Sequence, residues 1–463
     1  MTDGSSPTRR DPDSSRDTGD NGSSRLTANS PGSASSPGTG TSHRARPTST
    51  NKVLSDTHLN DTEIAQHPIV LTQPREGTPR PVDSPRGLQR AIARLAAGTG
   101  PLAVDAERAS GYRYSQRAYL IQLRRAGAGT VLVDPLPFGD LANLGEALKD
   151  TEWVLHAASQ DLPCLAELNL RPTRLFDTEL AARLAGFERV GLAALTERLL
   201  GFTLEKHHSA ADWSTRPLPL DWLTYAALDV ELLIELRYAL SAELERQGKL
   251  EWALEEFAAL VSAPPPRPRQ DPWRRTSGIH KVRGARALAR VRALWQARDQ
   301  VARERDLAPG RILPDAAIVA AAQTDPVGEQ ALLALPGFSS RSARRLSRVW
   351  LRALAEARAT PEADLPAATL PSDGPPPPHR WAERDPAAAN RLVRARATVS
   401  ALAAEHTLPP ENLLAPDTVR RLAWEPPKPL SSSTVADALA KYGARSWQIQ
   451  LTAAPLAAAL ADA

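Results

Sequence analysis

The pattern of hydrophobic and polar positions changes several times along the chain. Residues 1 to about 65 consist mainly of Ser, Thr, Gly, Pro, Asp and Arg, with almost no apolar positions. Such a segment cannot bury enough surface to offset its chain entropy, so we expect it to be disordered. A lead-in with one short apolar run at 69–71 extends this tail to residue 82.

A region with regular hydrophobic periodicity follows from 83 to 262. Four runs have the pattern and composition of strands, at 101–107 (PLAVDAE), 118–125 (AYLIQLRR), 130–135 (TVLVDP) and 152–158 (EWVLHAA). Helical patterns lie around them, at 88–98 after Ser84-Pro85, and at 140–150, 161–170, 176–186, 191–201 and 220 to about 260. Strands first and helices after, with a βα crossover among them, predict a mixed α/β sheet flanked by helices.

The C-terminal half is predicted to be all-helical. A basic, proline-rich linker (263–284) leads to a helical segment (285–358), and a second linker (359–383) contains DGPPPPHRW. The last segment (384–463) weakly repeats the one before it, since DLAPGRIL and TLPPENLL both follow a long helical pattern. A period of roughly 95–100 residues exceeds that of solenoid repeats, so we interpret the region as two copies of a small helical module.

Composition and charge narrow the class of protein. The 463-residue chain has a single cysteine, Cys164, which excludes an internal disulfide framework and a Cys-based zinc site and fits a reducing cytoplasm. It has no apolar run of about 18 residues and no secretory signal at its start, so no membrane association is expected. The net charge is −8 over 98–262 but +11 over 263–360. Such a basic block suggests a polyanionic partner. Solvent-exposed helix faces and a basic linker without any partner would explain the same excess of positive charge.

Candidate chemistry lies in four acidic residues and a tyrosine. Asp105 and Glu107 are two apart on a predicted strand and therefore share one face, while Tyr225 and Asp229 are four apart on a predicted helix. Asp161 follows the fourth strand. Oxygen ligands suit Mg²⁺, and two such ions promote phosphoryl displacement, so the set predicts a metal-dependent nuclease.

Each piece also has an ordinary structural explanation. The D-x-E pair is compatible with an exposed strand face, Asp161 with a helix N-cap, and Tyr225 with burial beside a surface Asp229. His156, at the end of the fourth strand, is expected to be structural.

Taken together, these motifs resemble those of the ribonuclease D family. VDAE, HAASQDL and YAALD resemble the three exonuclease motifs in their tyrosine form, and LEK…ADWSTRPL resembles the family signature between the second and third. Residues 285–356 resemble an HRDC domain, and 386–460 a second, divergent copy. The resemblance implies a ribonuclease H-like 3′–5′ exonuclease domain followed by one or two all-α HRDC-type domains.

The resemblance also implies roles for individual residues. Asp105, Glu107 and Asp229 would hold one divalent metal ion, and Asp161 a second that Asp105 bridges; Mg²⁺ or Mn²⁺ is expected. Tyr225 would orient the nucleophile or help to deprotonate it. The candidates for contacts with nucleic acid are Lys206, Trp213, Arg216, Arg274, Arg275, Lys281, Arg283, Arg286 and Arg290. Trp295 and Trp350 lie near basic runs, but their helical spacing favours core positions over base stacking.

The expected function is a 3′–5′ exoribonuclease that releases 5′-mononucleotides and processes the 3′ ends of tRNA or other structured RNA. Two alternatives remain at this point: a non-catalytic nucleic-acid-binding scaffold, and a 3′–5′ exonuclease that acts on DNA. The expected protein is a cytoplasmic monomer without a stable protein partner. Removal of 263–463 is expected to weaken binding of structured RNA and to leave cleavage of short single strands intact.

Overall fold

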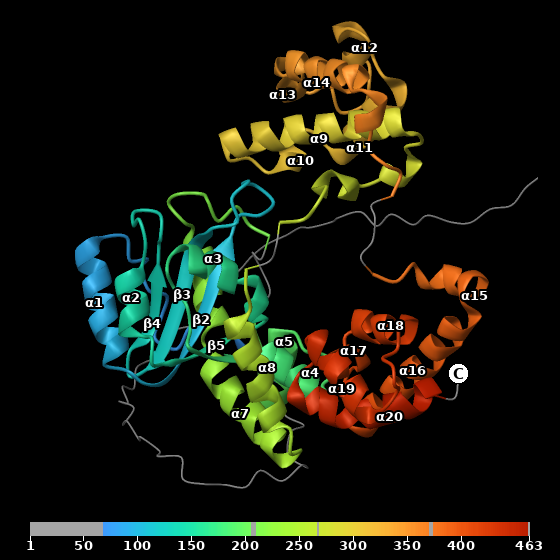
Figure 1. The fold of residues 1–463 in the computed structure, drawn as a ribbon. Coiled ribbons are helices and arrows are strands. Elements are labelled where there is room, and N and C mark those ends of the chain that lie inside the picture. The colour runs from blue at the N-terminus through green and yellow to red at the C-terminus, as the bar shows by residue number, and fades with distance from the viewer. Residues whose placement is uncertain (1–67, 205–209, 266–267, 370–373, 462–463) are drawn as a thin grey trace, which may run out of the picture. The chain divides into compact units, whose positions relative to one another are not determined.

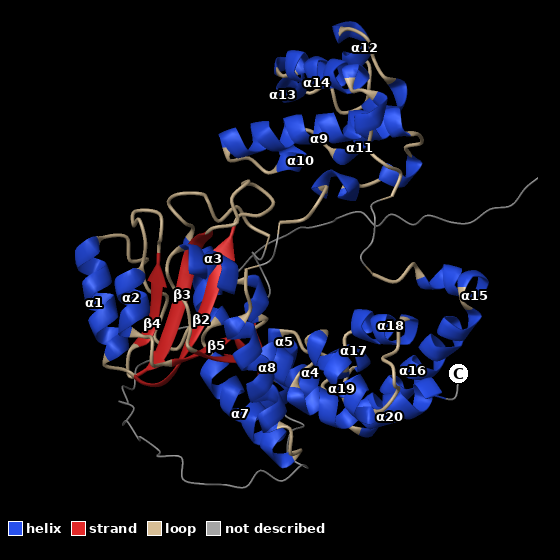
Figure 2. Cartoon of the chain, in the orientation of Figure 1, coloured by secondary structure: helices blue, strands red, loops and turns tan. Residues whose placement is uncertain are grey.

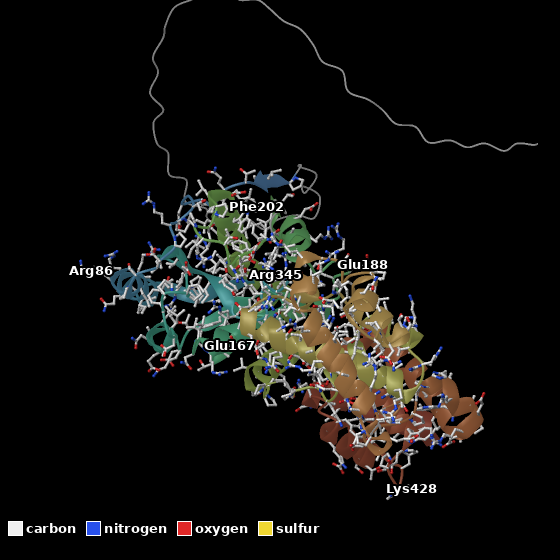
Figure 3. All side chains as sticks on the ribbon, turned by 90° about the horizontal axis from the view of Figure 1, so that it is seen from above. Arg86, Glu167, Glu188, Phe202, Arg345 and Lys428 are labelled. Carbon is white, nitrogen blue, oxygen red and sulfur yellow. The ribbon has the colours of Figure 1, made fainter. Side chains whose placement is uncertain are left out.

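The computed structural model describes residues 68–204, 210–265, 268–369 and 374–461 (Figure 1). The N-terminal segment that the sequence predicts to be disordered lies outside these residues. Within them, charged side chains such as Arg86, Glu167, Arg345 and Lys428 are exposed (Figure 3). None of the helices in the described ranges is both long and apolar enough to cross a membrane.

A five-stranded mixed sheet forms the centre of the N-terminal half (Figure 2). Its strands follow the order β4-β3-β2-β5-β6. They span Gly129–Val133 (β4), Ala118–Ala126 (β3), Thr99–Arg108 (β2), Glu152–Leu155 (β5) and Arg174–Asp177 (β6). β3 is antiparallel to β2 and β4, whereas β5 is parallel to β2 and β6. The mixed sheet predicted from the hydrophobic pattern is confirmed.

Helices surround this sheet, and α6 and α7 pack against β2, the strand that carries Asp105 and Glu107. α8 packs against β6. The helices of this half are α1 (Pro85–Ala96), α2 (Ala142–Ala147), α3 (Leu162–Glu167), α4 (Thr178–Leu184), α5 (Leu192–Leu200), α6 (Leu220–Asp229), α7 (Leu233–Arg246) and α8 (Leu250–Ser262).

Three short strands depart from the sequence prediction. β6 occupies the start of a segment that was predicted to be helical, and the helix α4 begins only at Thr178. β1 (Ile69–Leu71) and β7 (Phe202–Leu204) form a separate parallel pair. Strands of three or four residues carry too little periodicity to be distinguished from helix starts or lead-in segments.

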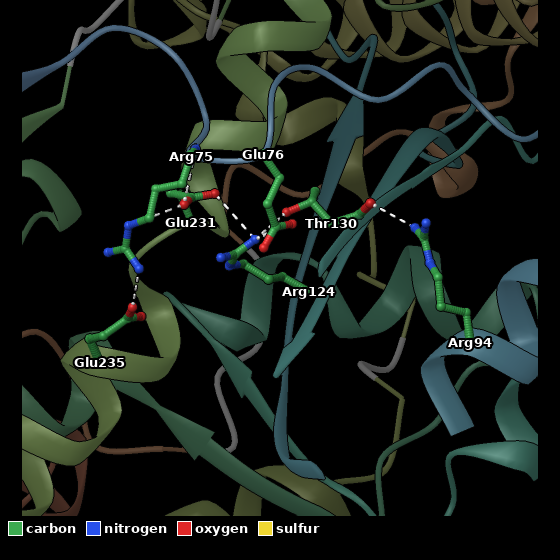
Figure 4. A network of polar contacts seen from close by, with 7 residues as sticks. All are labelled: Arg75, Glu76, Arg94, Arg124, Thr130, Glu231 and Glu235. Atoms are coloured by element: carbon green, nitrogen blue, oxygen red, sulfur yellow. Dashed lines mark hydrogen bonds and ion pairs between the residues drawn. The ribbon is translucent and has the colours of Figure 1, made fainter. Parts of the chain in front are cut away.

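The lead-in before α1 is fixed to the sheet and to α7 by a buried acid (Figure 4). Glu231 is fully buried two residues after Asp229, and it accepts a hydrogen bond from the backbone N–H of Arg75 at 3.3 Å. Arg124 of β3 lies 3.4 Å from Glu231, and Arg75 lies 2.8 Å from Glu235. The network therefore holds the C-terminal end of α6 against the sheet.

The first helical repeat (285–359) has a hydrophobic core of its own, in which Trp350 is fully buried and Trp295 is partly buried. This confirms the core interpretation of both tryptophans. Its helices are α9 (Ala285–Arg305), α10 (Pro309–Ile312), α11 (Asp315–Thr324), α12 (Glu329–Leu333), α13 (Arg341–Arg345) and α14 (Ser347–Ala359).

The second helical repeat (381–461) instead shares one continuous core with the sheet domain. The indole of Trp252 in α8 stacks on that of Trp447 at 4.9 Å between ring centroids. Its helices are α15 (Trp381–Arg384), α16 (Pro386–Glu405), α17 (Pro410–Leu413), α18 (Pro416–Trp424), α19 (Ser432–Lys441) and α20 (Ser446–Ala461). Deleting 263–463 would expose this shared core, so the structure argues against the expected clean separation of cleavage from the tail.

Candidate active site

The strand β2 presents two carboxylates on one face, as its period-2 geometry predicts. Asp105 and Glu107 are partly accessible, whereas Val104 and Ala106 between them are buried on the opposite face. Asp105 lies opposite Gln122 of the antiparallel neighbour β3, and Glu107 opposite Leu120. Both carboxylates therefore occupy a rigid central strand.

The helix α6 brings its last turn against these two acids. One carboxylate oxygen each from Asp105, Glu107 and Asp229 lies within 4.8 Å of the other two. Tyr225, one turn earlier on α6, is hydrogen-bonded to Asp229 through its side chain. Its ring lies 6.5 Å from that of Trp213. The structure thus brings together four of the five predicted residues.

Asp161 completes the group from the loop after β5. It precedes α3 at the N-cap position, but its side chain makes no capping hydrogen bond. Instead, its Oδ1 lies 3.4 Å from Nη2 of Arg108, and the charge of Asp105 acts on it. The capping explanation for Asp161 therefore fails.

Asp177 holds the loop that carries Asp161. Its carboxylate accepts hydrogen bonds from the backbone N–H groups of Ala157 (3.1 Å) and Ala158 (2.8 Å), and also caps α4 through Glu179 and Leu180. Ala157 has a positive φ of 60°, which these bonds stabilise. His156 is structural, as predicted: its Nδ1 lies 2.9 Å from Oγ1 of Thr178, and burial lowers its pKa to about 4.

Burial and mutual repulsion raise the pKa of every acid in the site. Burial is the main cause for Asp105, whose pKa is raised to about 6, and for Asp161, whose pKa is raised to about 8. Burial and neighbouring carboxylates also hold the pKa values of Glu107 and Asp229 well above their usual range. The same causes raise the pKa of Tyr225, so its hydroxyl keeps its proton at neutral pH and serves as a hydrogen-bond donor.

The donor set of this site fits divalent cations. Hard cations such as Mg²⁺ and Mn²⁺ bind carboxylate oxygens, and four closely spaced acids need positive charge before all can ionise. Arg108 supplies one such charge and lowers the pKa values of Asp105, Glu107 and Asp161. The pKa values of these carboxylates stay raised despite this single guanidinium. The site therefore still favours further positive charge, which one or more metal ions would supply.

Two residues predicted to bind nucleic acid are structural instead. Trp213 is fully buried and packs against Trp222, so its ring is not available to a base. Arg216 donates to both oxygens of Asp134, at 2.6 and 2.9 Å, and to the carbonyl oxygen of Tyr119 at 2.7 Å. The sequence prediction was wrong for both, because the burial of Trp213 and the pairing of Arg216 with Asp134, 82 residues away, arise only in the folded chain.

The other predicted contacts divide into two groups. Arg290 is also structural: its Nε donates to Ala322 O at 2.7 Å, and Nη1 lies 3.3 Å from Asp325. Arg274 and Arg286 also bond to the protein's own oxygens, at Asp271 and Ala367 and at Arg358 and Thr360 respectively. Arg275, Lys281 and Arg283 are exposed, and Lys206 lies outside the described residues.

Arg108 and Asp177 were both missed at the sequence level. Arg108 directly follows the D-x-E pair, and a basic residue next to two acids was a usable signal. Asp177 is the second residue of the predicted helix 176–186, where an acidic residue is ordinary, so nothing in the sequence alone pointed to the loop of Asp161.

Comparison with protein families matches three parts of the chain. A 3′–5′ exonuclease family matches residues 79–245, the HRDC domain family matches 287–354, and a family described as the 3′ to 5′ exonuclease C-terminal domain matches 374–460. The third match covers the second helical repeat.

Similar proteins and structures agree with these matches. Ribonuclease D of Gluconacetobacter diazotrophicus is 34% identical over 335 residues, covering 70% of this chain and 81% of the relative. A protein from Bifidobacterium adolescentis is 40% identical with a TM-score of 0.77, covering 85% of this chain and 100% of that one. Escherichia coli RNase D is 27% identical with a TM-score of 0.59, covering 78% and 97%. The acidic site, its mixed sheet and these relatives together show that the chain belongs to the ribonuclease D family of 3′–5′ exonucleases.

Proposed function

We propose that this exonuclease is a metal-dependent exoribonuclease that removes 5′-mononucleotides from the 3′ end of RNA. The observation that carries the proposal is the set of carboxylate oxygens of Asp105, Glu107 and Asp229 within 4.8 Å of one another. Tyr225 and Asp161 stand beside this set, each tied to it by charge and, for Tyr225, by a hydrogen bond.

The proposed roles follow from position and charge. Asp105, Glu107 and Asp229 would hold one divalent ion, while Asp161 and the shared Asp105 would hold a second. Such ions supply the positive charge that activates water and offsets the leaving 3′ oxygen. The hydroxyl of Tyr225 donates its proton to Asp229, and its oxygen would accept a hydrogen bond from the attacking water and thereby orient it. Because these groups are fixed by β2 and α6, little reorganisation is needed during the reaction.

RNA is the substrate that the relatives favour. Escherichia coli RNase D, whose structure is similar, is described as an exoribonuclease involved in structured RNA processing. The exposed Arg275, Lys281 and Arg283 precede the first helical repeat and are our candidates for phosphate contacts. On this basis we propose 3′ trimming of tRNA precursors or other structured RNA by a cytoplasmic monomer.

The test is a digest of matched RNA and DNA strands, labelled at either end, with Mg²⁺ or Mn²⁺. We expect stepwise 3′ shortening of RNA with release of 5′-mononucleotides, loss of activity in chelator, and loss in Asp105→Ala. Asp150→Ala, which removes an exposed acid away from the site, is the matched control and should retain activity. Activity that survives chelator or Asp105→Ala would refute the metal mechanism, and faster digestion of DNA would refute the RNA assignment.

A further inference from the structure

The loop between β2 and β3 borders a cavity that Glu107 of the active site also lines. It spans 109–117 and begins two residues after Glu107. Gly111 and Tyr112 line a cavity of about 210 Å³ together with Glu107 and Arg108. The Tyr112 hydroxyl also donates to the carbonyl oxygen of Ala210, which lines the same cavity, at 3.3 Å. The position of this loop therefore sets the shape of the space beside a catalytic carboxylate.

The turn that follows α9 in the first helical repeat holds this loop. Asp306 accepts a hydrogen bond from the backbone N–H of Ser115 at 2.9 Å, and the N–H of Ala308 donates to Tyr112 O at 3.0 Å. The Nε of Arg311 donates to Gly111 O at 2.9 Å, and its guanidinium lies 4.1 Å from the centre of the Tyr112 ring. The loop backbone is thus fixed at three points by residues of the helical repeat.

A tyrosine side chain strengthens the same contact. Tyr114 packs against the hydrophobic core of the first repeat, and its hydroxyl donates to Asp299 of α9 at 3.0 Å. Arg303, one turn further along α9, lies over the Tyr114 ring at 5.6 Å. The loop therefore contributes an aromatic side chain to the helical repeat and receives backbone hydrogen bonds from it.

The two helical repeats use the same turn to contact the sheet domain. Asp306 and Thr407 occupy equivalent places after α9 and α16, and both have a positive φ, of 47° and 50°. Thr407 O accepts a hydrogen bond from the buried Lys249 at 3.4 Å and approaches Gly186 so closely that a Cβ there would clash with it. The equivalence extends to a pair of half-buried arginines, since Arg391 donates to a helix carbonyl as Arg290 does.

The turn after α9 and the turn after α16 contact different parts of the sheet domain. The second turn offers a backbone carbonyl to Lys249, just before α8, and lies close to Gly186, just after α4, and its repeat shares the core of the sheet domain. The first turn has a carboxylate in place of Thr407, and it contacts the loop 109–117 instead. Aspartate tolerates positive φ better than most residues, so this position combines the turn with a side-chain acceptor.

We propose that the first helical repeat is a positioning element of the active site, and that Asp306 and Arg311 are positioning residues for cleavage. They act through the loop 109–117, which they hold beside Glu107. This role is separate from RNA binding by the basic surface, and its kinetic test rests on the proposed exoribonuclease activity.

The kinetic test uses an RNA trinucleotide, whose two linkages offer little to an extended basic surface. In the full-length protein, Asp306→Ala and Arg311→Ala should each lower kcat by about 10- to 100-fold with little change in KM, since small misplacements of catalytic groups have effects of this size. Asp306→Asn keeps an acceptor for Ser115 and should restore most of kcat. Glu304→Ala, an exposed acid on the last turn of α9, is the matched control and should behave as wild type.

A second measurement does not depend on activity. Amide hydrogen exchange in the full-length protein should become faster in 109–117 for Asp306→Ala and Arg311→Ala, and should remain unchanged for Glu304→Ala. If Asp306→Ala unfolds the repeat, Arg311→Ala decides, because its side chain is exposed. Unchanged exchange in the loop, or an effect on KM alone, would overturn the proposal. A wild-type protein that fails to cleave the trinucleotide would count against the proposed function, while the exchange result would still decide the role of the turn.

Discussion

The guanidinium of Arg108 lies 3.4 Å from the carboxylate of Asp161, inside the acidic group of the active site. Its positive charge lowers the pKa of Asp161, which burial and Asp105 raise. It also repels any divalent ion at Asp161. Arg108 therefore has two opposing effects: it favours the ionised form of Asp161, and it weakens the binding of a metal ion to that carboxylate.

Replacing this arginine should strengthen metal binding. Arg108→Gln removes a positive charge that repels any cation bound at Asp161. A divalent ion carries two charges and the proton that it displaces carries one, so the substitution stabilises binding of the ion more than binding of the proton. At a separation of about 5 Å and an effective dielectric constant of about 20, this extra unit of charge corresponds to about 3 kcal/mol, or on the order of 100-fold in Kd. Titration calorimetry with Mn²⁺ at pH 8 measures it, with the exposed Arg117→Gln as control. Weaker binding in Arg108→Gln would contradict this account.

The raised pKa values predict how stability depends on pH. Asp105 and Asp161 bind protons in the folded state up to pH values of about 6 and about 8, whereas in the unfolded chain both lose them near 3.8. The folded state therefore binds more protons between these values, and stability from these groups falls as pH rises from about 4 to 8. In chelator, Asp161→Asn should melt at least about 2 °C higher than wild type at pH 8, with a smaller difference at pH 5.

Metal binding should reverse this loss. Because the ions compete with protons for the same carboxylates, Mg²⁺ should raise the melting temperature more at pH 8 than at pH 6. Asp229→Asn should reduce that response, since it removes one of the three clustered carboxylates. A Mg²⁺ response that is independent of pH, measured by differential scanning calorimetry, would show that these carboxylates are not the metal ligands.

Arg216 should matter for stability and not for RNA affinity. It pairs with both oxygens of Asp134, which is 8% exposed, so Arg216→Ala leaves a buried carboxylate without its partner. We expect a loss of about 3 kcal/mol in the free energy of unfolding, at the lower end for such pairs because the guanidinium is partly exposed. Urea unfolding and RNA titration at fixed salt measure the two quantities. Unchanged stability with weakened RNA binding would restore the original interpretation of Arg216.

The exposed basic residues before the first repeat should show the opposite behaviour. The triple variant Arg275→Ala, Lys281→Ala, Arg283→Ala should weaken RNA binding and flatten its dependence on salt, while the melting temperature stays near that of wild type. Each lost phosphate contact lowers the slope of log K against log salt by about 0.7 for a single strand. An unchanged slope would exclude these residues as the RNA anchor.

The second helical repeat should be needed for the sheet domain to stay folded. Trp447 is 3% exposed and stacks on Trp252, so Trp447→Ala should cost about 3 kcal/mol or more of stability. Hydrogen exchange should become faster in α8. Trp350→Ala disrupts the separate core of the first repeat and serves as the control, because it should leave exchange in α8 unchanged. Equal exchange in α8 for wild type and Trp447→Ala would contradict the shared core.

Local sequence pattern predicted the parts of this protein that depend on short-range geometry. Alternation along β2 placed Asp105 and Glu107 on one face, and helical spacing placed Tyr225 above Asp229. The internal repeat was also visible, because α10 and α17 follow proline turns of the same form.

The errors concern partners that are distant in the chain. Arg216 is 82 residues from Asp134, and no local pattern distinguishes such an arginine from one that faces a phosphate. The stacking of Trp252 on Trp447, and the contact of Asp306 with Ser115, likewise arise only when the chain is folded. The local pattern therefore predicted which residues form the site, but not the long-range contacts that support them.

The buried thiol of Cys164 has a practical consequence. It is 2% exposed beneath the loop of Asp161, and burial raises its pKa to about 12, so almost none of it is thiolate at neutral pH. Maleimide reagents therefore have no reactive target on the native protein. A cysteine introduced at an exposed position, such as Ser339, would carry a single fluorophore or spin label without replacement of the native Cys164.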